Sequence, residues 1–140
     1  MPSTLHSYVQ INIGAYFRYE HRVRLTVLSE LGVELSGVKT VPDLAVYDKL
    51  EIDFSQDVIT RTDAPLLTVE ILSPIQALQD LTDKTDHYLV AGVRLCWVVL
   101  PPLQAVVVYH APGQYTFFTA QDVLKDQSLN IELPLTDIFR

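Results

Sequence analysis

The chain has 140 residues, of which 49 % are hydrophobic and 19 % charged; this fits one globular domain, residues 1–140, and excludes a disordered chain. Its net charge of −7, from 10 basic and 17 acidic side chains, argues against binding nucleic acid through bulk charge, although a local basic patch stays open. No apolar run reaches the roughly 18–20 residues that span a bilayer, and no leader peptide is recognisable. We therefore expect a cytoplasmic protein, in which the single cysteine, Cys96, is a buried thiol.

Hydrophobic spacing in the first half of the chain predicts one helix followed by short strands. Apolar side chains recur at helical spacing within residues 5–19. Alternating or apolar β-type runs then predict strands at residues 22–28, around V-E-L within 32–39, at 43–47 and at 66–72. The polar stretch 48–65 has no clear period and is expected to be a connecting excursion.

A second helix is predicted over residues 74–91. Ser73 is a suitable N-cap, Pro74 fits the first helical position, and Gln76 completes a capping box. Gly92 suits the left-handed residue that ends a helix. The apolar residues expected on one face of this helix are Ile75, Leu78, Leu81, Tyr88 and Leu89.

The last third of the chain is predicted to be rich in β-strands. Residues 93–100 read as a strand buried on both faces, with Trp97 in the core. Residues 105–109 and 114–119 predict a hairpin around A-P-G-Q, followed by a short strand at 129–133 and a helical turn at 136–139. The fold class is therefore α/β or α+β, with one mixed sheet flanked by helices.

The runs V-V-V-Y and Y-T-F-F in this third would suit a homodimer, or they could simply close the core. A symmetric dimer is the expected state, because most soluble oligomers are symmetric dimers.

One carboxylate, Glu70, lies in the middle of the apolar run L-T-V-E-I-L-S-P. An ionised carboxylate in a dry interior is costly unless it is paired or bound to a metal. If strands 43–47 and 66–72 pair antiparallel, Asp43 comes close to Glu70, and a Mg²⁺ ion relieves their repulsion. The alternative is that Asp43 is a solvated loop residue and Glu70 pairs with a lysine or arginine.

Lys84 borders the apolar face of the second predicted helix, which begins just after the Glu70 strand. From there its amine could reach the two carboxylates and stabilise the negative charge that develops during hydrolysis. The alternative is a surface lysine paired with Asp80, one turn earlier. His87 could line the site, whereas surface or capping positions are expected for the other histidines: His6, His21 and His110.

Four segments, in order, resemble motifs of the Uma family of restriction endonucleases, first catalogued as a domain of unknown function. They are V-P-D-L-A-V-Y, L-T-V-E-I-L-S-P, D-L-T-D-K-T-D-H-Y-L-V-A-G-V and L-C-W-V-V-L-P-P. The resemblance covers about residues 6–110. The family is similar to the PD-(D/E)xK nucleases, which implies a restriction-endonuclease-like core, with a mixed central sheet flanked by helices.

The resemblance also implies a site. Asp43 and Glu70 match the acids that bind Mg²⁺ (or Mn²⁺), and Lys84 matches a lysine that assists the hydrolytic water. The usual lysine position, two residues after the glutamate, holds Leu72; the family supplies the lysine from the following helix instead. The catalytic set implied is therefore Asp43, Glu70 and Lys84, in an endonuclease that hydrolyses DNA.

Two departures from the family pattern matter. Family members carry further residues, some acidic, before the first helix, whereas this chain begins close to His6. An acid from elsewhere could replace them, and spacing does not choose among Glu20, Glu30 and Glu34. In addition, Leu100 stands where an acid is common, at a position expected to be structural.

Two functions therefore stay open at this point. One is a Mg²⁺-dependent endonuclease, favoured by retention of the three catalytic candidates. The other is a nuclease-fold module that binds nucleic acid or a protein partner without cutting, favoured by the net charge of −7.

Overall fold

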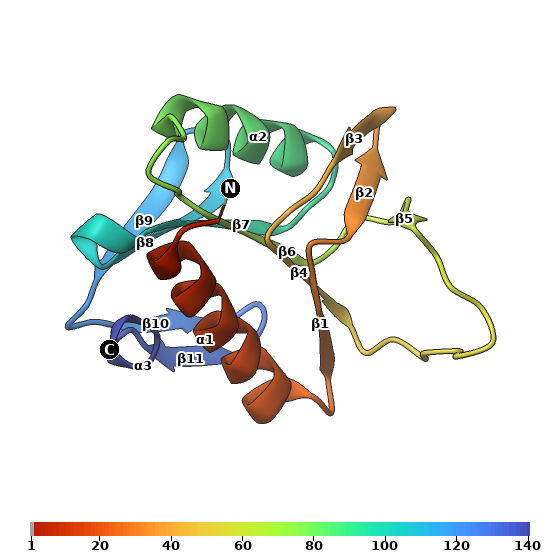
Figure 1. Ribbon diagram of the computed structural model, residues 1–140, viewed down its shortest axis with the longest axis horizontal. Coiled ribbons are helices and arrows are strands. Elements are labelled where there is room, and N and C mark those ends of the chain that lie inside the picture. Colours follow the sequence, from red (N-terminus) through yellow and green to blue (C-terminus); the bar gives the residue numbers. More distant parts are fainter. Residues whose placement is uncertain (1) are drawn as a thin grey trace.

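A six-stranded mixed sheet forms the centre of the computed structural model, which describes residues 2–140 (Figure 1). The strand order is β1-β4-β6-β7-β8-β9. Only the β6–β7 pair of this sheet is parallel, within the described residues. The strands are β1 (Leu25–Ser29), β4 (Leu44–Asp48), β6 (Leu67–Ile71), β7 (Leu95–Leu100), β8 (Ala105–Ala111) and β9 (Gln114–Thr119).

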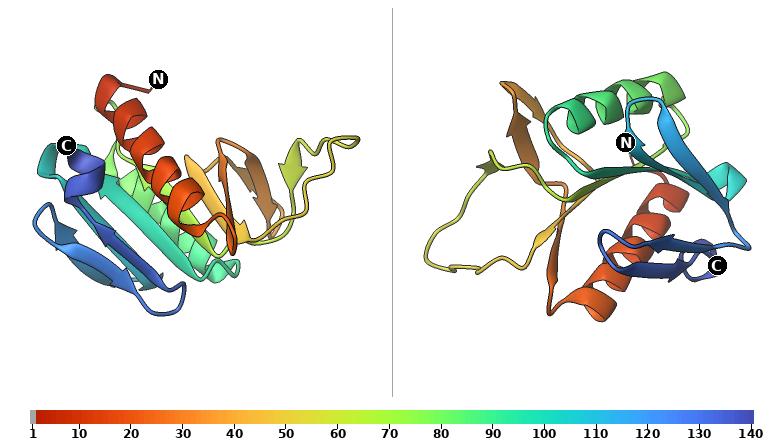
Figure 2. Two further views of the ribbon diagram at one scale, coloured as in Figure 1. Left: turned by 90° about the horizontal axis from the view of Figure 1, so that it is seen from below. Right: turned by 180° about the vertical axis from the view of Figure 1, so that it is seen from behind.

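Helices cover both faces of this sheet, as Figures 1 and 2 show. Helix α1 (Thr4–His21), helix α3 (Thr136–Phe139) and the hairpin of β10 (Val123–Asp126) and β11 (Ile131–Pro134) lie on one face. Helix α2 (Leu78–Val90) lies on the other. The mixed sheet flanked by helices predicted from the sequence is confirmed. No helix among residues 2–140 has the length and apolarity that crossing a membrane requires.

Strand β7 lies at the centre of the core, and all six of its residues are buried. Trp97 packs in the core on the α1 face, whereas Cys96 faces α2; both were predicted to be buried. Val106, Val107 and Val108 of β8 are buried as well. The V-V-V-Y run therefore closes the core, which is one of the two possibilities that the sequence left open.

Helix α2 differs from its prediction at its start. It begins at Leu78 after Ala77, with no side-chain cap, so the predicted capping box at Ser73 is wrong. Residues 73–76 form a turn, in which the Gln76 N–H donates to the Ser73 carbonyl (3.1 Å), because the chain must first cross from β6 to the helix layer. Ile75 is consequently 84 % exposed. The predicted end is confirmed, since Gly92 has a φ of +108°.

A small outlying sheet has the order β3-β2-β5, with β2 (Gly32–Leu35), β3 (Val38–Thr40) and β5 (Thr60–Arg61). Before β5, residues 49–59 project from the body of the molecule (Figures 1 and 2); we call this segment the arm. It corresponds to most of the excursion predicted over 48–65. Strand β1 starts three residues later than predicted, because α1 extends to His21 and a turn follows. Strand β10 was not predicted.

Candidate active site

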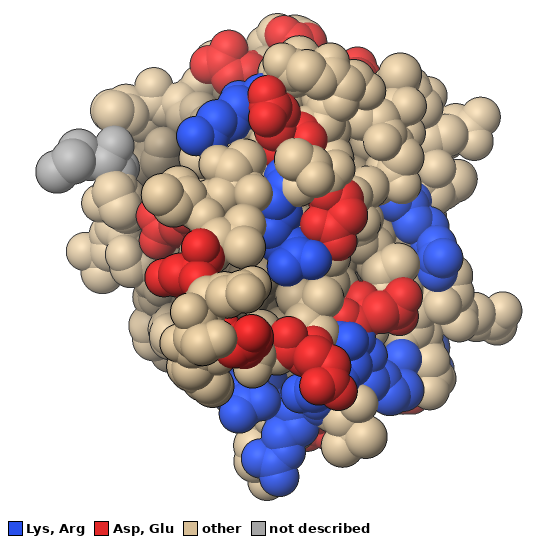
Figure 3. All heavy atoms as spheres, turned by 90° about the vertical axis from the view of Figure 1, so that its right-hand side faces the viewer, with Lys and Arg blue, Asp and Glu red and all other residues tan. Residues whose placement is uncertain are grey.

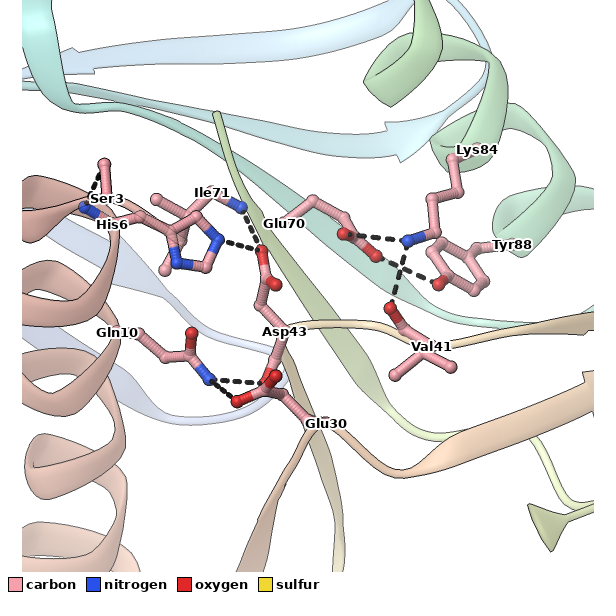
Figure 4. A network of polar contacts seen from close by, with 10 residues as sticks. All are labelled: Ser3, His6, Gln10, Glu30, Val41, Asp43, Glu70, Ile71, Lys84 and Tyr88. Carbon is pink, nitrogen blue, oxygen red and sulfur yellow. Dashed lines mark hydrogen bonds and ion pairs between the residues drawn. The ribbon is translucent and has the colours of Figure 1, made fainter. Parts of the chain in front are cut away.

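Glu70 is a buried carboxylate in the middle of β6, and its side chain is only 4 % exposed. One oxygen lies 3.1 Å from the Lys84 amine, and the other accepts a hydrogen bond of 3.0 Å from the Tyr88 hydroxyl (Figure 4). The Lys84 amine also donates to the Val41 carbonyl, at 3.0 Å. Lys84 thus connects α2 both to β6 and to the segment that leads into β4.

Two periodicities bring these side chains together. Alternate residues of β6 face opposite sides of the sheet, so that Val69 and Ile71 pack toward α1 while Glu70 faces α2. On α2, Tyr88 is fully buried, and Lys84 lies one turn earlier on the same side. Among the ion pairs of the described residues, none joins Lys84 to Asp80; the amine contacts Glu70 instead.

Asp43 is the residue immediately before β4, close to Glu70 of the neighbouring strand β6. Strands β4 and β6 are antiparallel with Leu44 opposite Val69, so continuing this register by one residue places Asp43 opposite Glu70. The Asp43 carboxylate accepts a hydrogen bond of 2.7 Å from the Ile71 N–H. It therefore supplies the acceptor that β6 needs at the point where main-chain pairing with β4 ends.

His6 holds the same Asp43 oxygen, with 3.1 Å between Nε2 and Oδ2. It is 8 % exposed, although a surface or capping position was expected, so that expectation was wrong. Ser3 caps α1 by accepting from the His6 N–H at 3.1 Å, which fixes the first turn of the helix. A signal was available, because His6 continues the spacing of the buried residues Val9 and Ile13.

The three predicted site residues are only partly brought together. Glu70 and Lys84 touch directly. Asp43 touches neither side chain and is linked to them only by its hydrogen bond with the Ile71 N–H of β6. In Figure 4 the β6 ribbon runs between the two carboxylates: Asp43 contacts His6 of α1, and Glu70 contacts α2. The two charges still interact, because Asp43 contributes to raising the pKa of Glu70.

A surface hollow of about 420 Å³ opens beside Asp43. Its wall includes His6, Glu30 and Asp80; of the described residues that line it, none is Glu70 or Lys84. Of the three acids that spacing could not separate, Glu30 contacts Asp43, because its N–H donates to the Asp43 carbonyl at 3.1 Å. The hollow is therefore an acidic pocket beside Asp43, and its described lining does not reach Glu70 or Lys84.

The environment of Glu70 makes its charge depend on pH in the neutral range. Burial raises its pKa from 4.5 to about 7, the Lys84 charge and the hydrogen bonds from Lys84 and Tyr88 oppose this rise, and the Asp43 charge adds to it. Burial also raises the pKa of Tyr88 well above its ordinary value, so its hydroxyl stays a donor. With a pKa of about 7, the Glu70 carboxyl is partly protonated and partly ionised near neutral pH.

The residues present fit a hard divalent cation better than a thiophilic one. Within residues 2–140, histidine, cysteine, aspartate and glutamate form no group of three that could hold a metal ion. A pair of carboxylates is nevertheless the donor set that Mg²⁺ commonly uses, since it keeps several of its waters. A cation beside Glu70 would also offset the cost of ionising a buried carboxylate.

Comparison with known proteins places this chain in a family. A crystal structure of a putative nuclease belonging to DUF820 from Anabaena variabilis is similar in fold, with a TM-score of 0.85 and 24 % identity. The match covers 99 % of this chain and 82 % of the other. No curated protein matches the chain. The Uma2 family model, described as putative restriction endonuclease, matches residues 1–136. The chain therefore belongs to the Uma2 family.

Proposed function

We propose that this protein is a Mg²⁺-dependent endonuclease that hydrolyses phosphodiester bonds in DNA, with Asp43 and Glu70 as metal ligands and Lys84 as the catalytic amine. The observation that carries the proposal is the direct contact of Lys84 with a buried carboxylate that lies opposite Asp43 in the strand register. Membership of a family described as putative restriction endonuclease supports the same conclusion.

Each side chain has a definable task in this proposal. Asp43 and Glu70 would each supply a carboxylate oxygen to the ion near the point where the β4–β6 pairing ends. Mg²⁺ or Mn²⁺ bound there would polarise a phosphoryl oxygen and lower the pKa of the attacking water. Lys84 places a positive charge beside Glu70, where it stabilises negative charge that develops on the reacting phosphate.

The neighbouring residues prepare this arrangement. Tyr88 orients the Glu70 carboxylate through its hydroxyl, and His6 and the Ile71 N–H fix one oxygen of Asp43. Outer hydrogen bonds of this kind commonly set the orientation of metal-binding carboxylates. The hydrogen bond and the ion pair of the Asp43 carboxylate both involve Oδ2 among the described residues, so Oδ1 is the oxygen that would face the ion.

DNA binding by this chain is expected to be weak and local. Figure 3 shows basic side chains interspersed with acidic ones on the face that carries the arm, without one continuous basic surface. Because affinity for DNA depends on the number of phosphates neutralised by lysine and arginine, a chain with a net charge of −7 has few such contacts to offer.

Calorimetric titration with Mn²⁺ tests the metal site directly. The wild type is expected to bind at submillimolar to millimolar concentrations, and Glu70→Gln and Asp43→Asn are each expected to abolish binding. Glu34→Gln, which removes an exposed acid from β2, is the matched control and should bind as the wild type does. A wild type that binds no Mn²⁺ at several millimolar contradicts the proposal.

Nicking of supercoiled plasmid tests the chemistry. With Mg²⁺ or Mn²⁺ the wild type is expected to nick, and Lys84→Ala should lose nicking while keeping its metal affinity and circular dichroism spectrum. Unchanged nicking by Lys84→Ala would show that the amine comes from another residue. Metal binding without any nicking on plasmid or single-stranded DNA would favour a module that binds without cutting.

A further inference from the structure

A group of exposed cations lies where α1 ends and β1 begins. We call it the basic patch; its members are Arg18 in the last turn of α1, Arg22 and Arg24 in the turn before β1, and Lys49 at the base of the arm. The Lys49 N–H donates to the Arg24 carbonyl at 2.9 Å, which brings the base of the arm beside this turn. In Figure 3, basic side chains gather at the lower end of the face, the end where α1 stops in Figure 1. An acidic chain thus concentrates four of its ten lysines and arginines in one place.

The charge of the basic patch is not neutralised by carboxylates. Among the ion pairs of residues 2–140, none includes a member of the patch. Arg24 is held by neutral groups instead, with 3.0 Å to the Leu129 carbonyl and 3.0 Å to His21 Nδ1. Two exposed acids, Glu20 and Asp48, adjoin the patch in the sequence, so the cations outnumber the acids.

The negative end of the α1 dipole accounts for only part of this arrangement. Cations near the last turn of a helix are favourable, which explains Arg18 and Arg22. Arg24 and Lys49 lie outside the helix, and that explanation does not reach them. The patch is therefore free to attract an anionic partner.

An exposed aromatic side chain lies among these cations. Tyr19 is 80 % exposed and follows Arg18 directly. Arg22 comes three residues later with helical backbone angles (φ −60°, ψ −21°), and residues three apart on a helix are neighbours. An aromatic ring flanked by guanidinium groups is the combination that binds single-stranded nucleic acid, because the ring stacks on a base and the cations contact phosphates.

Strand β1 connects the basic patch to the candidate active site. The patch adjoins the start of β1, and Glu30, just after its end, donates its N–H to the Asp43 carbonyl. The five residues of β1 span about 17 Å. The surface between is concave, since Arg18 and Glu30 line one hollow of about 470 Å³ and Glu30 also lines the hollow beside Asp43. A strand that passes Asp43 can therefore reach the patch within a few nucleotides.

We propose that the basic patch and Tyr19 form a subsite for single-stranded DNA, which binds the part of the strand that flanks the scissile phosphate. Tyr19 stacks on an unpaired base, and Arg22 and Lys49 pair with phosphates. The inference rests on the proposed function for the position of the scissile phosphate, beside Asp43. An acidic protein segment is the rival occupant; it would satisfy the cations and leave the exposed ring without a stacking partner.

Fluorescence anisotropy of a labelled oligothymidylate, in EDTA and low salt, tests the charges. The wild type is expected to bind at micromolar concentrations. The double variant Arg22→Gln/Lys49→Gln is expected to bind roughly tenfold more weakly, with a slope of log affinity against log salt that is smaller by about 1.4. The control Lys39→Gln/Lys125→Gln removes the same charge from exposed lysines of β3 and β10 and should bind as the wild type does. An equal loss in both double variants overturns the proposal, as does a wild type that does not bind.

Tyr19→Ala tests the stacking. It is expected to weaken oligothymidylate binding roughly fivefold or more, whereas Phe54→Ala, at a 97 % exposed ring of the arm, should have no effect. The wild type should bind a duplex more weakly than the single strand, and Tyr19→Ala should leave duplex binding unchanged, because paired bases offer the ring no face. A Tyr19→Ala variant that binds the single strand like the wild type overturns the subsite. A poly-aspartate peptide that binds as tightly as oligothymidylate overturns the choice of DNA.

These measurements separate the subsite from the proposed catalysis, because EDTA removes any metal. Arg22→Gln/Lys49→Gln should keep the Mn²⁺ affinity and circular dichroism spectrum of the wild type. A chain that binds oligothymidylate through the patch but takes up no Mn²⁺ supports the subsite and contradicts the proposed nuclease. A chain that binds Mn²⁺ and nicks plasmid, while this double variant binds DNA normally, overturns the subsite alone.

Discussion

Lys84 and Glu70 form an ion pair across the contact between α2 and β6, with 3.1 Å from Nζ to Oε1. The carboxylate is almost completely buried, whereas the amine is a quarter exposed. Burial has the larger effect, so the pKa of Glu70 lies at about 7 despite the nearby cation. Protonation of Glu70 near neutral pH therefore removes the negative charge from this ion pair.

The metal-free protein is expected to be more stable at pH 5 than at pH 8 because of Glu70. The pKa of this carboxyl is about 7 in the folded state and 4.5 in the reference state. Its contribution to stability is complete below pH 4.5 and is lost as the pH rises through 7, for a total of about 3 kcal/mol. Urea unfolding of the wild type and Glu70→Gln, in EDTA, measures this difference.

Glu70→Gln should flatten this part of the pH dependence, because it removes the titrating group. Glu34→Gln, in which an exposed acid is neutralised, should leave it unchanged. The assignment to Glu70 would be wrong if both variants kept the wild-type difference between pH 5 and pH 8.

Lys84→Met is expected to destabilise the folded protein at pH 8 by about 2 kcal/mol, because it leaves the ionised Glu70 carboxylate buried without its cation. At pH 5 the loss should be small, since Glu70 is then protonated. Chemical unfolding at both pH values provides the measurement. Lys125→Met, at an exposed lysine of β10, is the control. An equal loss at both pH values would indicate that Lys84 contributes through packing alone.

Tyr88→Phe is expected to cost about 1–2 kcal/mol at pH 8, because the variant removes the hydroxyl that donates to Glu70 inside the core. It should also raise the pKa of Glu70 further, so that the pH dependence of unfolding moves to higher pH. Tyr19→Phe removes a hydroxyl that lies on an 80 % exposed side chain and should change neither quantity. A Tyr88→Phe profile that overlays the wild type would contradict this role.

His6→Ala is expected to weaken Mn²⁺ binding roughly 10–100-fold, because the Asp43 carboxylate loses the partner that fixes Oδ2. His6→Gln keeps a donor at a similar distance and should recover part of the affinity. Calorimetry on the two variants provides the test without DNA. Should Asp43→Asn abolish binding while His6→Ala leaves it intact, the Ile71 N–H alone orients the carboxylate.

Much of the fold was predictable from local patterns. The buried strand around Trp97, the hairpin after it and the helix stop at Gly92 all follow from periodicity and turn chemistry. The start of α2 was not predictable in this way. The residues Ser73 to Gln76 match a helix N-terminus by type, but the path from the sheet to the helix layer uses them in a turn.

The contacts within the candidate site were predictable to a similar extent. The contact between Glu70 and Lys84 follows from a strand that feeds directly into a helix, and the antiparallel register of β4 and β6 places Asp43 opposite Glu70. The direction in which the Asp43 carboxylate turns could not be predicted, because a residue beyond the end of a strand no longer follows the two-residue period. The burial of His6 was missed because residue type suggested the surface although spacing indicated the core.

The amine of the candidate site is carried by a helix that rests on the sheet, and no main-chain ladder ties the two together. Small shifts or rotations of α2 therefore alter the reach of Lys84 while every strand stays in register. Substitutions in the apolar contact between this helix and the sheet, such as Leu81 of α2 or Val98 of β7, are therefore expected to change the distance between Lys84 and Glu70 without replacing either residue of the ion pair.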